Sequence, residues 1–224
     1  MHDSIFQPHR YLDFHTHRMR HADRADVMEI VSVHPGKGHP HQYFTIGYHP
    51  WWIEVPIAPA QHDTLVERLA DPECLALGEV GLDNLKGPTL NRQMEILRSQ
   101  LPLAVVTGKP VIIHCVRAFD QLVRVKREFP DIRHWCIHGY GRHGILARQL
   151  IDQGFYLSLM PGLPDKKYQE LCEAIPLNRM FLETDSMPDV SIDDIYFKMA
   201  GILTMEVTDL CRQMNVNAQN FFQR

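Results

Sequence analysis

The stretch Tyr11-Leu-Asp-Phe-His-Thr-His17 decides how the rest of the chain is interpreted. Its apolar and aromatic residues are followed by a basic, polar run over 18–24 without an apolar period, so a buried strand is predicted over 11–16. Residues two apart on a strand point to the same side. We therefore expect His15 and His17 to emerge together where this strand ends. Such a pair alone is often structural, and its meaning depends on the residues that follow.

Seven more short apolar runs are strand-like, over 27–33, 43–47, 74–77, 111–114, 134–137, 155–159 and 180–182. The spacing of apolar residues predicts helices over 60–69, 90–106, 119–129, 143–152, 166–174 and 193–214. Strands that alternate with helices indicate a parallel sheet, and eight of them predict an α/β fold, a (β/α)8 TIM-type barrel. A different α/β sheet is the structural alternative.

The early connections of this predicted barrel are short. Residues 18–26 leave no room for a full helix with its loops, and residues 34–41 form a His, Pro and Gly loop where a helix normally stands. A length of 224 residues is at the short end for this fold. We expect a single domain over residues 1–224, shortened by helices missing between its early strands.

Composition limits the classes of partner and compartment. The formal charge of -4 excludes a basic surface that grips long duplex DNA, so an anionic substrate must be held locally. Five cysteines, none in a Cys-x-x-Cys pair, favour free thiols in a reducing compartment. Residues 1–10 lack the apolar core of a signal peptide, and no run reaches the roughly 18 apolar residues of a membrane span. We expect a cytoplasmic protein without a membrane segment or an obligate protein partner.

Ligand-type side chains stand at or just after the ends of six predicted strands. Active sites of such barrels lie at the carboxyl ends of the strands. Each side chain alone has a structural explanation, such as a histidine bonded to a backbone carbonyl or a carboxylate that caps a helix. Their convergence on one rim favours a metal site instead. In chain order they are His15, His17, His49, Glu79, His114, His138, Glu183 and Asp185.

Four imidazoles and two carboxylates exceed the needs of one tetrahedral metal, which indicates two divalent ions (Zn, Mg or Mn) sharing a bridging carboxylate. Glu79 is the expected bridge, because its strand stands between the two halves of the ligand set. The expected halves are His15, His17 and Asp185 on the adjoining first and eighth strands, and His114 and His138 on the fifth and sixth. Such ions activate a water for attack. Glu79 and Asp185 are the predicted catalytic residues, with Asp185 also a base.

Three residues are candidate substrate contacts. Arg117 follows the fifth strand and can clamp a phosphate, although a salt bridge that caps the next helix fits equally well. His49 can donate to a phosphate oxygen or serve as a buried structural residue. Trp51, with Trp52, can stack on an unpaired base or cover a hydrophobic gap. Glu183 is expected to orient a ligand rather than to bind metal.

Six motifs follow one another in order along nearly the whole chain. They are Asp-Phe-His-Thr-His at 13–17, Gly-Tyr-His-Pro at 47–50, Gly-Glu-Val-Gly-Leu-Asp at 78–83, Ile-His-Cys-Val-Arg at 113–117, His-Gly-Tyr-Gly at 138–141 and Glu-Thr-Asp-Ser-Met-Pro at 183–188. Through them the chain resembles the TatD-type metal-dependent hydrolases, a branch of the amidohydrolase superfamily with deoxyribonuclease members. The resemblance implies the same ligands, with Glu79 between one metal held by His15, His17 and Asp185 and another held by His114 and His138. It also implies hydrolysis of phosphodiester bonds near DNA strand ends.

Two other functions stay open at this point. An amidohydrolase acting on a small cyclic amide, lactone or phosphoester uses the same pair of ions. Many of those enzymes bridge their metals with a carboxylated lysine, and the glutamate at position 79 favours the nuclease-like branch. The second alternative is a non-catalytic binding module stabilised by metal, in which metal raises the melting temperature without turnover.

Overall fold

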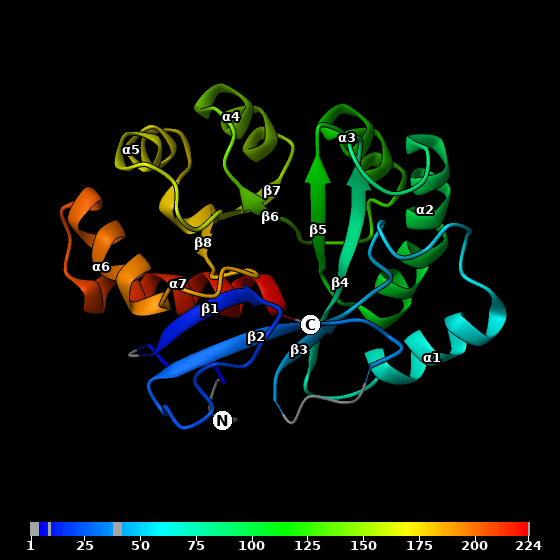
Figure 1. The fold of residues 1–224 in the computed structure, drawn as a ribbon, viewed down its shortest axis with the longest axis horizontal. Coiled ribbons are helices and arrows are strands. Elements are labelled where there is room, and N and C mark those ends of the chain that lie inside the picture. The colour runs from blue at the N-terminus through cyan, green and yellow to red at the C-terminus, as the bar shows by residue number, and fades with distance from the viewer. Residues whose placement is uncertain (1–4, 9, 38–41, 224) are drawn as a thin grey trace. The chain divides into compact units, whose positions relative to one another are not determined.

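A computed structural model describes residues 5–8, 10–37 and 42–223, and its strands form one eight-stranded sheet in chain order (Figure 1). The strands are β1 (Tyr11–Thr16), β2 (Val27–Val33), β3 (Phe44–Ile46), β4 (Cys74–Asp83), β5 (Val111–Val116), β6 (Trp135–Tyr140), β7 (Phe155–Leu159) and β8 (Met180–Leu182). The helices are α1 (Pro59–Leu69), α2 (Leu90–Thr107), α3 (Phe119–Glu128), α4 (Gly144–Asp152), α5 (Asp165–Ala174), α6 (Ile192–Leu203) and α7 (Val207–Phe222), with the short 3₁₀ helix η1 at Leu177–Arg179.

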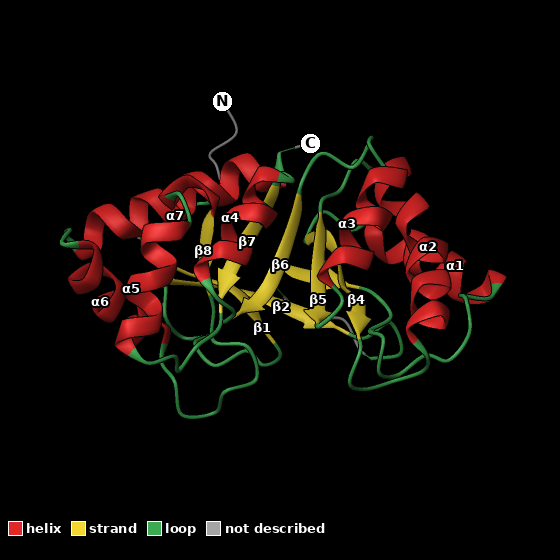
Figure 2. Cartoon of the chain, turned by 90° about the horizontal axis from the view of Figure 1, so that it is seen from above, coloured by secondary structure: helices red, strands yellow, loops and turns green. Residues whose placement is uncertain are grey.

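The chain divides into two compact units, and the division falls within β2 and β6. Unit 1 comprises the described residues up to Ile30 together with His138–Gln223, and unit 2 comprises Val31–Ile137. In unit 2, α1 and α2 pack against β4, and α3 packs against β5 (Figure 2). In unit 1, α4 packs against β7, and α6 and α7 pack against β1 and β8. Each unit therefore covers its own strands with helices.

Three central strands extend further than the apolar runs predict. β4, β5 and β6 continue through polar residues, and the parallel pairing of β4 with β5 reaches Asp83 and Val116. The expectation that Glu79 follows its strand is therefore wrong, because Glu79 lies inside β4. An apolar run ends at the first polar side chain, whereas backbone pairing does not depend on the side chain. The other five strands lie at or within two residues of their predicted positions.

The last predicted helix, over 193–214, is wrong because the chain forms two helices there. α6 ends at Leu203, and the next residue, Thr204, adopts a left-handed backbone with φ 53° and donates its N–H to the Ala200 carbonyl. A β-branched residue rarely takes this conformation, so the sequence carries no clear signal for the break. α7 begins again at Val207.

Two further expectations about local structure hold in the described residues. The connection 18–26 contains no helix, as predicted. Residues 38–41 of the predicted helix-free loop lie outside the described residues. All five cysteines are free thiols. Among the described residues, no helix has the length and apolar character needed to cross a bilayer.

The core of unit 1 fixes the direction of β1. Phe14 stacks on Phe181 of β8 with ring centroids 3.9 Å apart, and its edge meets Phe221 of α7 at 5.5 Å. Phe14 therefore points toward the helices. Because side chains alternate along a strand, His15 points to the opposite face of the sheet.

Candidate active site

The backbone of unit 1 joins the end of β1 to the segment after β8. The Asp185 N–H donates to the His15 carbonyl at 2.9 Å, the His17 N–H donates to the Asp185 carbonyl at 3.4 Å, and Thr16 and Asp185 form an isolated parallel bridge. One carboxylate oxygen of Asp185 lies 3.3 Å from His17 Nε2. The side chains of His15, His17 and Asp185 each offer a ligand atom within 4.8 Å of the others. Main-chain pairing therefore brings together three residues predicted to share a metal.

Asp185 is held ionised by its neighbours. Burial raises the pKa of this carboxyl, but the hydrogen bond from His17 and the charges of His138 and His15 outweigh burial and bring the pKa well below its usual range. Its backbone adopts a left-handed φ of 50°. Aspartate is among the few residues that tolerate this conformation, which aims the side chain back toward β1.

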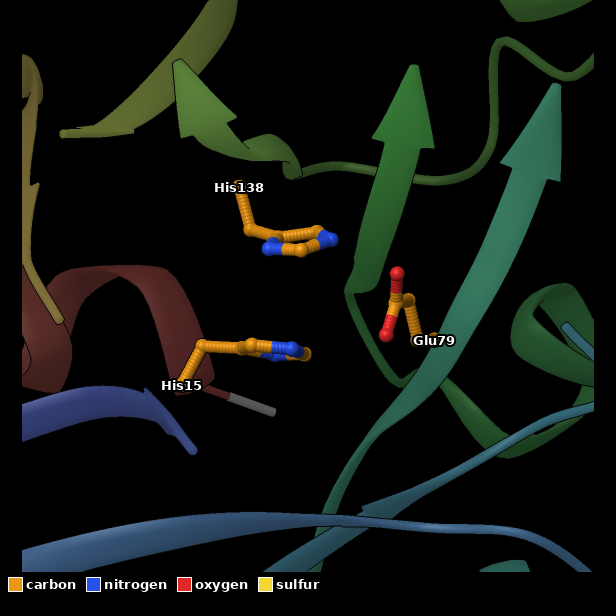
Figure 3. Close-up of side chains that lie close together, drawn as sticks. All are labelled: His15, Glu79 and His138. Carbon is orange, nitrogen blue, oxygen red and sulfur yellow. The ribbon is translucent and has the colours of Figure 1, made fainter. Parts of the chain in front are cut away.

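His138 belongs to the same group in unit 1. Its ring stacks on that of His15 with centroids 4.0 Å apart, as Figure 3 shows. Its Nδ1 lies 3.4 Å from Glu183 Oε1, which also accepts the Gly139 N–H at 2.7 Å. Glu183 is fully buried, and its Oε2 has no hydrogen-bond partner among the described residues. A buried carboxylate oxygen without a donor is costly, and a cation satisfies it.

Asp13 anchors the segment that carries Glu183 and Asp185, a role that was not predicted for it. Both of its oxygens accept hydrogen bonds from Thr184, one from the backbone N–H at 2.9 Å and one from the hydroxyl. Burial raises the pKa of Asp13 to about 8, against the lowering effect of those hydrogen bonds. Thr184 stands between Glu183 and Asp185, so Asp13 fixes the backbone that carries both carboxylates.

Unit 2 contains a second cluster, around Glu79. Glu79 is 4% exposed, and its Oε1 lies 2.9 Å from both His49 Nε2 and His114 Nδ1. His49 Nδ1 accepts the backbone N–H of Trp51 at 3.1 Å, so its Nε2 carries the hydrogen and donates to Glu79. The structure thus places His49 against a carboxylate, in a buried position. His49, Glu79 and His114 each offer a ligand atom within 4.8 Å of the others.

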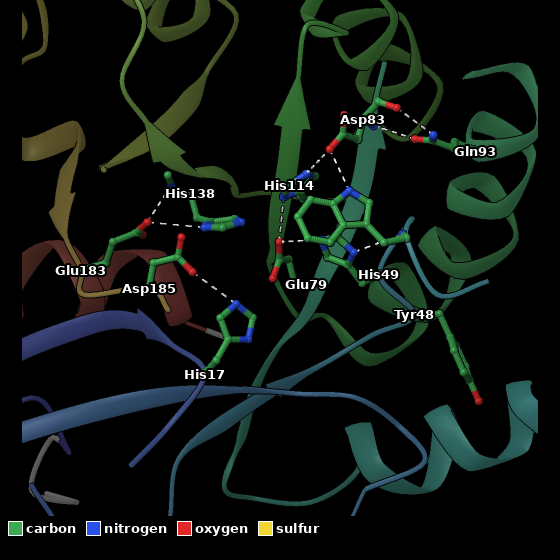
Figure 4. A network of polar contacts seen from close by, with 12 residues as sticks. His17, Tyr48, His49, Glu79, Asp83, Gln93, His114, His138, Glu183 and Asp185 are labelled. Atoms are coloured by element: carbon green, nitrogen blue, oxygen red, sulfur yellow. Dashed lines mark hydrogen bonds and ion pairs between the residues drawn. The ribbon is translucent and has the colours of Figure 1, made fainter. Parts of the chain in front are cut away.

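Asp83 extends this cluster. Its Oδ2 accepts the Trp51 indole N–H at 2.7 Å and lies 3.1 Å from His114 Nε2 (Figure 4). Its Oδ1 accepts the N–H groups of Leu85 and Lys86, which close a turn after β4. Burial raises the pKa of Asp83, but the bonds from His114, Leu85 and Trp51 together lower it below the usual range.

Close contact between β4 and β5 sets the distance between Glu79 and His114. Gly81 has φ 153°, and a Cβ built there would lie 2.0 Å from the His114 carbonyl oxygen. Only glycine permits this approach. The pairing shifts register between Leu77 and Val80, at the point where Glu79 turns toward its histidines.

Two of the residues predicted to contact substrate, Arg117 and Trp51, lie outside the two clusters of metal-ligand candidates. Arg117 is exposed just after β5, with a left-handed φ of 49°. Trp51 is half-buried, its indole N–H is bonded to Asp83, and Lys86 Nζ lies 3.6 Å from its ring centroid. Trp52 is 57% exposed beside it, with ring centroids 6.5 Å apart.

The donors of both clusters fit a divalent cation. Imidazole nitrogens and carboxylate oxygens are common ligands of Zn and Mn, and each cluster offers both kinds within reach of one ion. The unsatisfied oxygen of Glu183 is a further sign that unit 1 is arranged around positive charge.

Comparisons with known proteins point to the same chemistry. The model of the family described as TatD related DNase matches residues 32–223. An uncharacterized metal-dependent hydrolase of Methanocaldococcus jannaschii is 27% identical over 201 residues, which cover 81% of this chain and 76% of the relative. A protein of Salmonella typhimurium named 3'-5' ssDNA/RNA exonuclease TatD is 27% identical over 158 residues, 66% of this chain and 59% of that protein. An uncharacterized metal-dependent hydrolase of Buchnera aphidicola is 32% identical over 119 residues, 51% of this chain and only 45% of its own length.

A solved structure shows the same fold. The crystal structure of a TatD homolog from Escherichia coli superposes with a TM-score of 0.78 at 19% identity, covering 96% of this chain and 99% of that one. The predicted fold class, a shortened (β/α)8 TIM-type barrel, is confirmed.

Proposed function

We propose that this chain, which belongs to the TatD related DNase family, is a metal-dependent hydrolase that cleaves phosphodiester bonds near the ends of nucleic acid strands. The family match bears out the resemblance found in the sequence. The observation that carries the proposal is the joining of β1 to the segment after β8, which gathers His15, His17 and Asp185. The names of two relatives, a metal-dependent hydrolase and a 3'-5' ssDNA/RNA exonuclease, support it.

The proposal assigns the metal ligands as the sequence predicted them. In unit 1, His15, His17 and Asp185 hold a divalent ion. His114 and Glu79 in unit 2 and His138 in unit 1 complete the predicted set. The number of ions and the bridging role of Glu79 stay predictions.

The chain's own residues supply the rest of the chemistry. When bound, divalent ions would lower the pKa of water and polarise the P–O bonds of the phosphorus atom that the water attacks. Asp185 is the proposed acceptor of the proton that the attacking water loses. His49 holds the carboxylate of Glu79 in one orientation. Arg117, exposed beyond β5, is the proposed clamp for the phosphate, and the exposed Trp52 together with Trp51 is the proposed surface for a base.

The test is a hydrolysis assay with purified protein in Mg, Mn or Zn, on single-stranded DNA, a generic phosphodiester and a dihydroorotate-like amide. We expect cleavage of the phosphodiesters. Replacing Asp185 with Asn or Glu79 with Gln should lower the rate by at least about 100-fold, because each change removes a charged ligand. Asp131→Asn, on an exposed carboxylate, is the control and should leave the rate unchanged.

Circular dichroism must show that the variants stay folded. Rates near wild type in folded Asp185→Asn would contradict the proposal. Cleavage of the amide alone would favour an amidohydrolase acting on small cyclic substrates, and metal binding without any turnover would favour a binding module.

A further inference from the structure

Five polar contacts form a closed ring in unit 2 (Figure 4). The backbone N–H of Trp51 meets His49, His49 meets Glu79, Glu79 meets His114, His114 meets Asp83, and the indole N–H of Trp51 returns to Asp83. Trp51 therefore contributes two donors to the ring, its backbone N–H and its indole N–H. The proposed function uses Glu79 and His114, but it gives no role to Asp83.

The chemistry of the donors fixes the hydrogens in this ring. The indole N–H is only a donor, so Oδ2 of Asp83 is an acceptor. His114 Nε2, 3.1 Å from that same oxygen, must then carry a hydrogen. In the neutral ring this leaves the lone pair on Nδ1, which faces Glu79 Oε1 at 2.9 Å.

In that form Nδ1 of His114 and Oε1 of Glu79 are two neighbouring donor atoms that one cation can bind together. Oε1 of Glu79 already accepts the Nε2–H of His49, and it faces the Nδ1 lone pair of His114. The neutral form of the ring, with its hydrogen on Nε2, is the form that a metal-binding histidine requires.

We propose that Asp83 is a positioning residue, which fixes the tautomer and orientation of His114 so that Nδ1 and the neighbouring Glu79 carboxylate can bind one divalent cation. This inference rests on the proposed function, because it assigns His114 to metal binding. Asp83 is itself anchored, since Gln93 from α2 accepts its N–H at 2.6 Å and donates to its carbonyl at 2.8 Å. The carboxylate therefore reaches His114 from a fixed backbone.

Asp83 also has a structural task, and the test must separate the two. Its Oδ1 closes the turn at Leu85 and Lys86. Asp83→Asn keeps an oxygen for that turn but presents an NH₂ group to His114, which favours the opposite tautomer. Asp71→Asn is the matched control, because Asp71 Oδ1 closes a similar turn at Glu73, before β4.

The experiment measures zinc affinity by competition with a chromophoric chelator, in the wild type and the variants. Asp83→Asn should weaken the site that contains His114 by about 10- to 100-fold, with little change in melting temperature. In a His114→Ala background, Asp83→Asn should have no further effect on affinity. Asp71→Asn should leave affinity unchanged.

Affinity within twofold of wild type in Asp83→Asn would overturn the inference. So would an equal loss of affinity in the His114→Ala background, because Asp83 would then act by another route. Failure of the wild type to bind zinc is a different outcome, which defeats the proposed function together with this inference. Normal zinc binding and hydrolysis in Asp83→Asn leaves the proposed function standing and rejects only the role of Asp83.

Discussion

At the scale of single residues, His49 is a support for Glu79. Its Nδ1 accepts the Trp51 N–H, so its Nε2–H donates to the Glu79 carboxylate at 2.9 Å. Removing a donor from a buried carboxylate costs about 1.5 to 3 kcal/mol for a charged hydrogen bond. Glu79 is 4% exposed, so water replaces that donor poorly.

We therefore predict that His49→Ala lowers kcat by about 10- to 100-fold and changes KM little. Steady-state kinetics at saturating metal measures both constants. His62→Ala is the control, because His62 is an exposed histidine on α1. A raised KM at constant kcat would show instead that His49 contacts the substrate, which is the role that the sequence suggested.

Some residues of the candidate site could be predicted from the sequence, and others could not. His15, His17, His114, His138 and Asp185 stand out in the sequence because ligand-type residues recur at predicted strand ends. Asp13 and Asp83 do not stand out, because their roles depend on partners far away in the chain: Thr184 lies 171 residues from Asp13, and Trp51 lies 32 residues from Asp83. No local pattern encodes such contacts.

At the scale of elements, an ion pair ties the helix-free connection after β1 to the start of α6. Arg24 makes two bonds to the carboxylate of Asp193, at 2.7 and 2.8 Å. The bonds from Arg24 lower the pKa of Asp193 to about 2. A carboxylate whose pKa is lowered in the folded state stabilises the fold above its unfolded pKa, and this contribution is lost as the pH falls through the folded value.

We predict that Asp193→Asn lowers the free energy of unfolding by about 1 to 2 kcal/mol at pH 7. The difference from wild type should shrink as the pH falls below 3.8 and should be nearly gone at pH 2. Urea unfolding across this range measures it. Asp194→Asn is the control, since Asp194 shares the first turn of α6 but is exposed. If both variants lowered the free energy of unfolding equally, the loss would come from the interaction of a negative charge with the helix dipole and not from the ion pair with Arg24.

The elements also show where sequence patterns stop being informative. β1, β2, β7 and β8 begin and end where the apolar runs do, because burial sets those limits. β4, β5 and β6 continue into the site, where polar side chains interrupt the apolar run but not the ladder. The break at Thr204 was not predictable, because Thr204 adopts a left-handed backbone that β-branched residues rarely take, so no local residue preference marks it.

At the scale of the whole molecule, the proposed metal binding should be coupled to folding. Histidine and carboxylate ligands that are far apart in the sequence form no site in the unfolded chain, so metal binds the folded state selectively. Zinc at about 100 times its dissociation constant should add about 2.7 kcal/mol of stability for each independent site.

We predict that EDTA lowers the melting temperature and that zinc restores it. Differential scanning calorimetry measures the shift. In Asp185→Asn the zinc-dependent part should be clearly smaller, while the metal-free melting temperature stays close to that of the wild type. If neither EDTA nor zinc changed the melting temperature of the wild type, the proposed metal binding would be contradicted.

The bridge between Thr16 and Asp185 has a consequence for how such a site tolerates change. Peptide groups form this bridge, so its main-chain hydrogen bonds do not depend on the side chains at neighbouring positions. Neighbouring positions can drift over generations, or be randomised in a library, while the carboxylate keeps its place beside His15. A main-chain bridge of this kind allows the residues that contact substrate to change while the predicted metal ligands keep their positions.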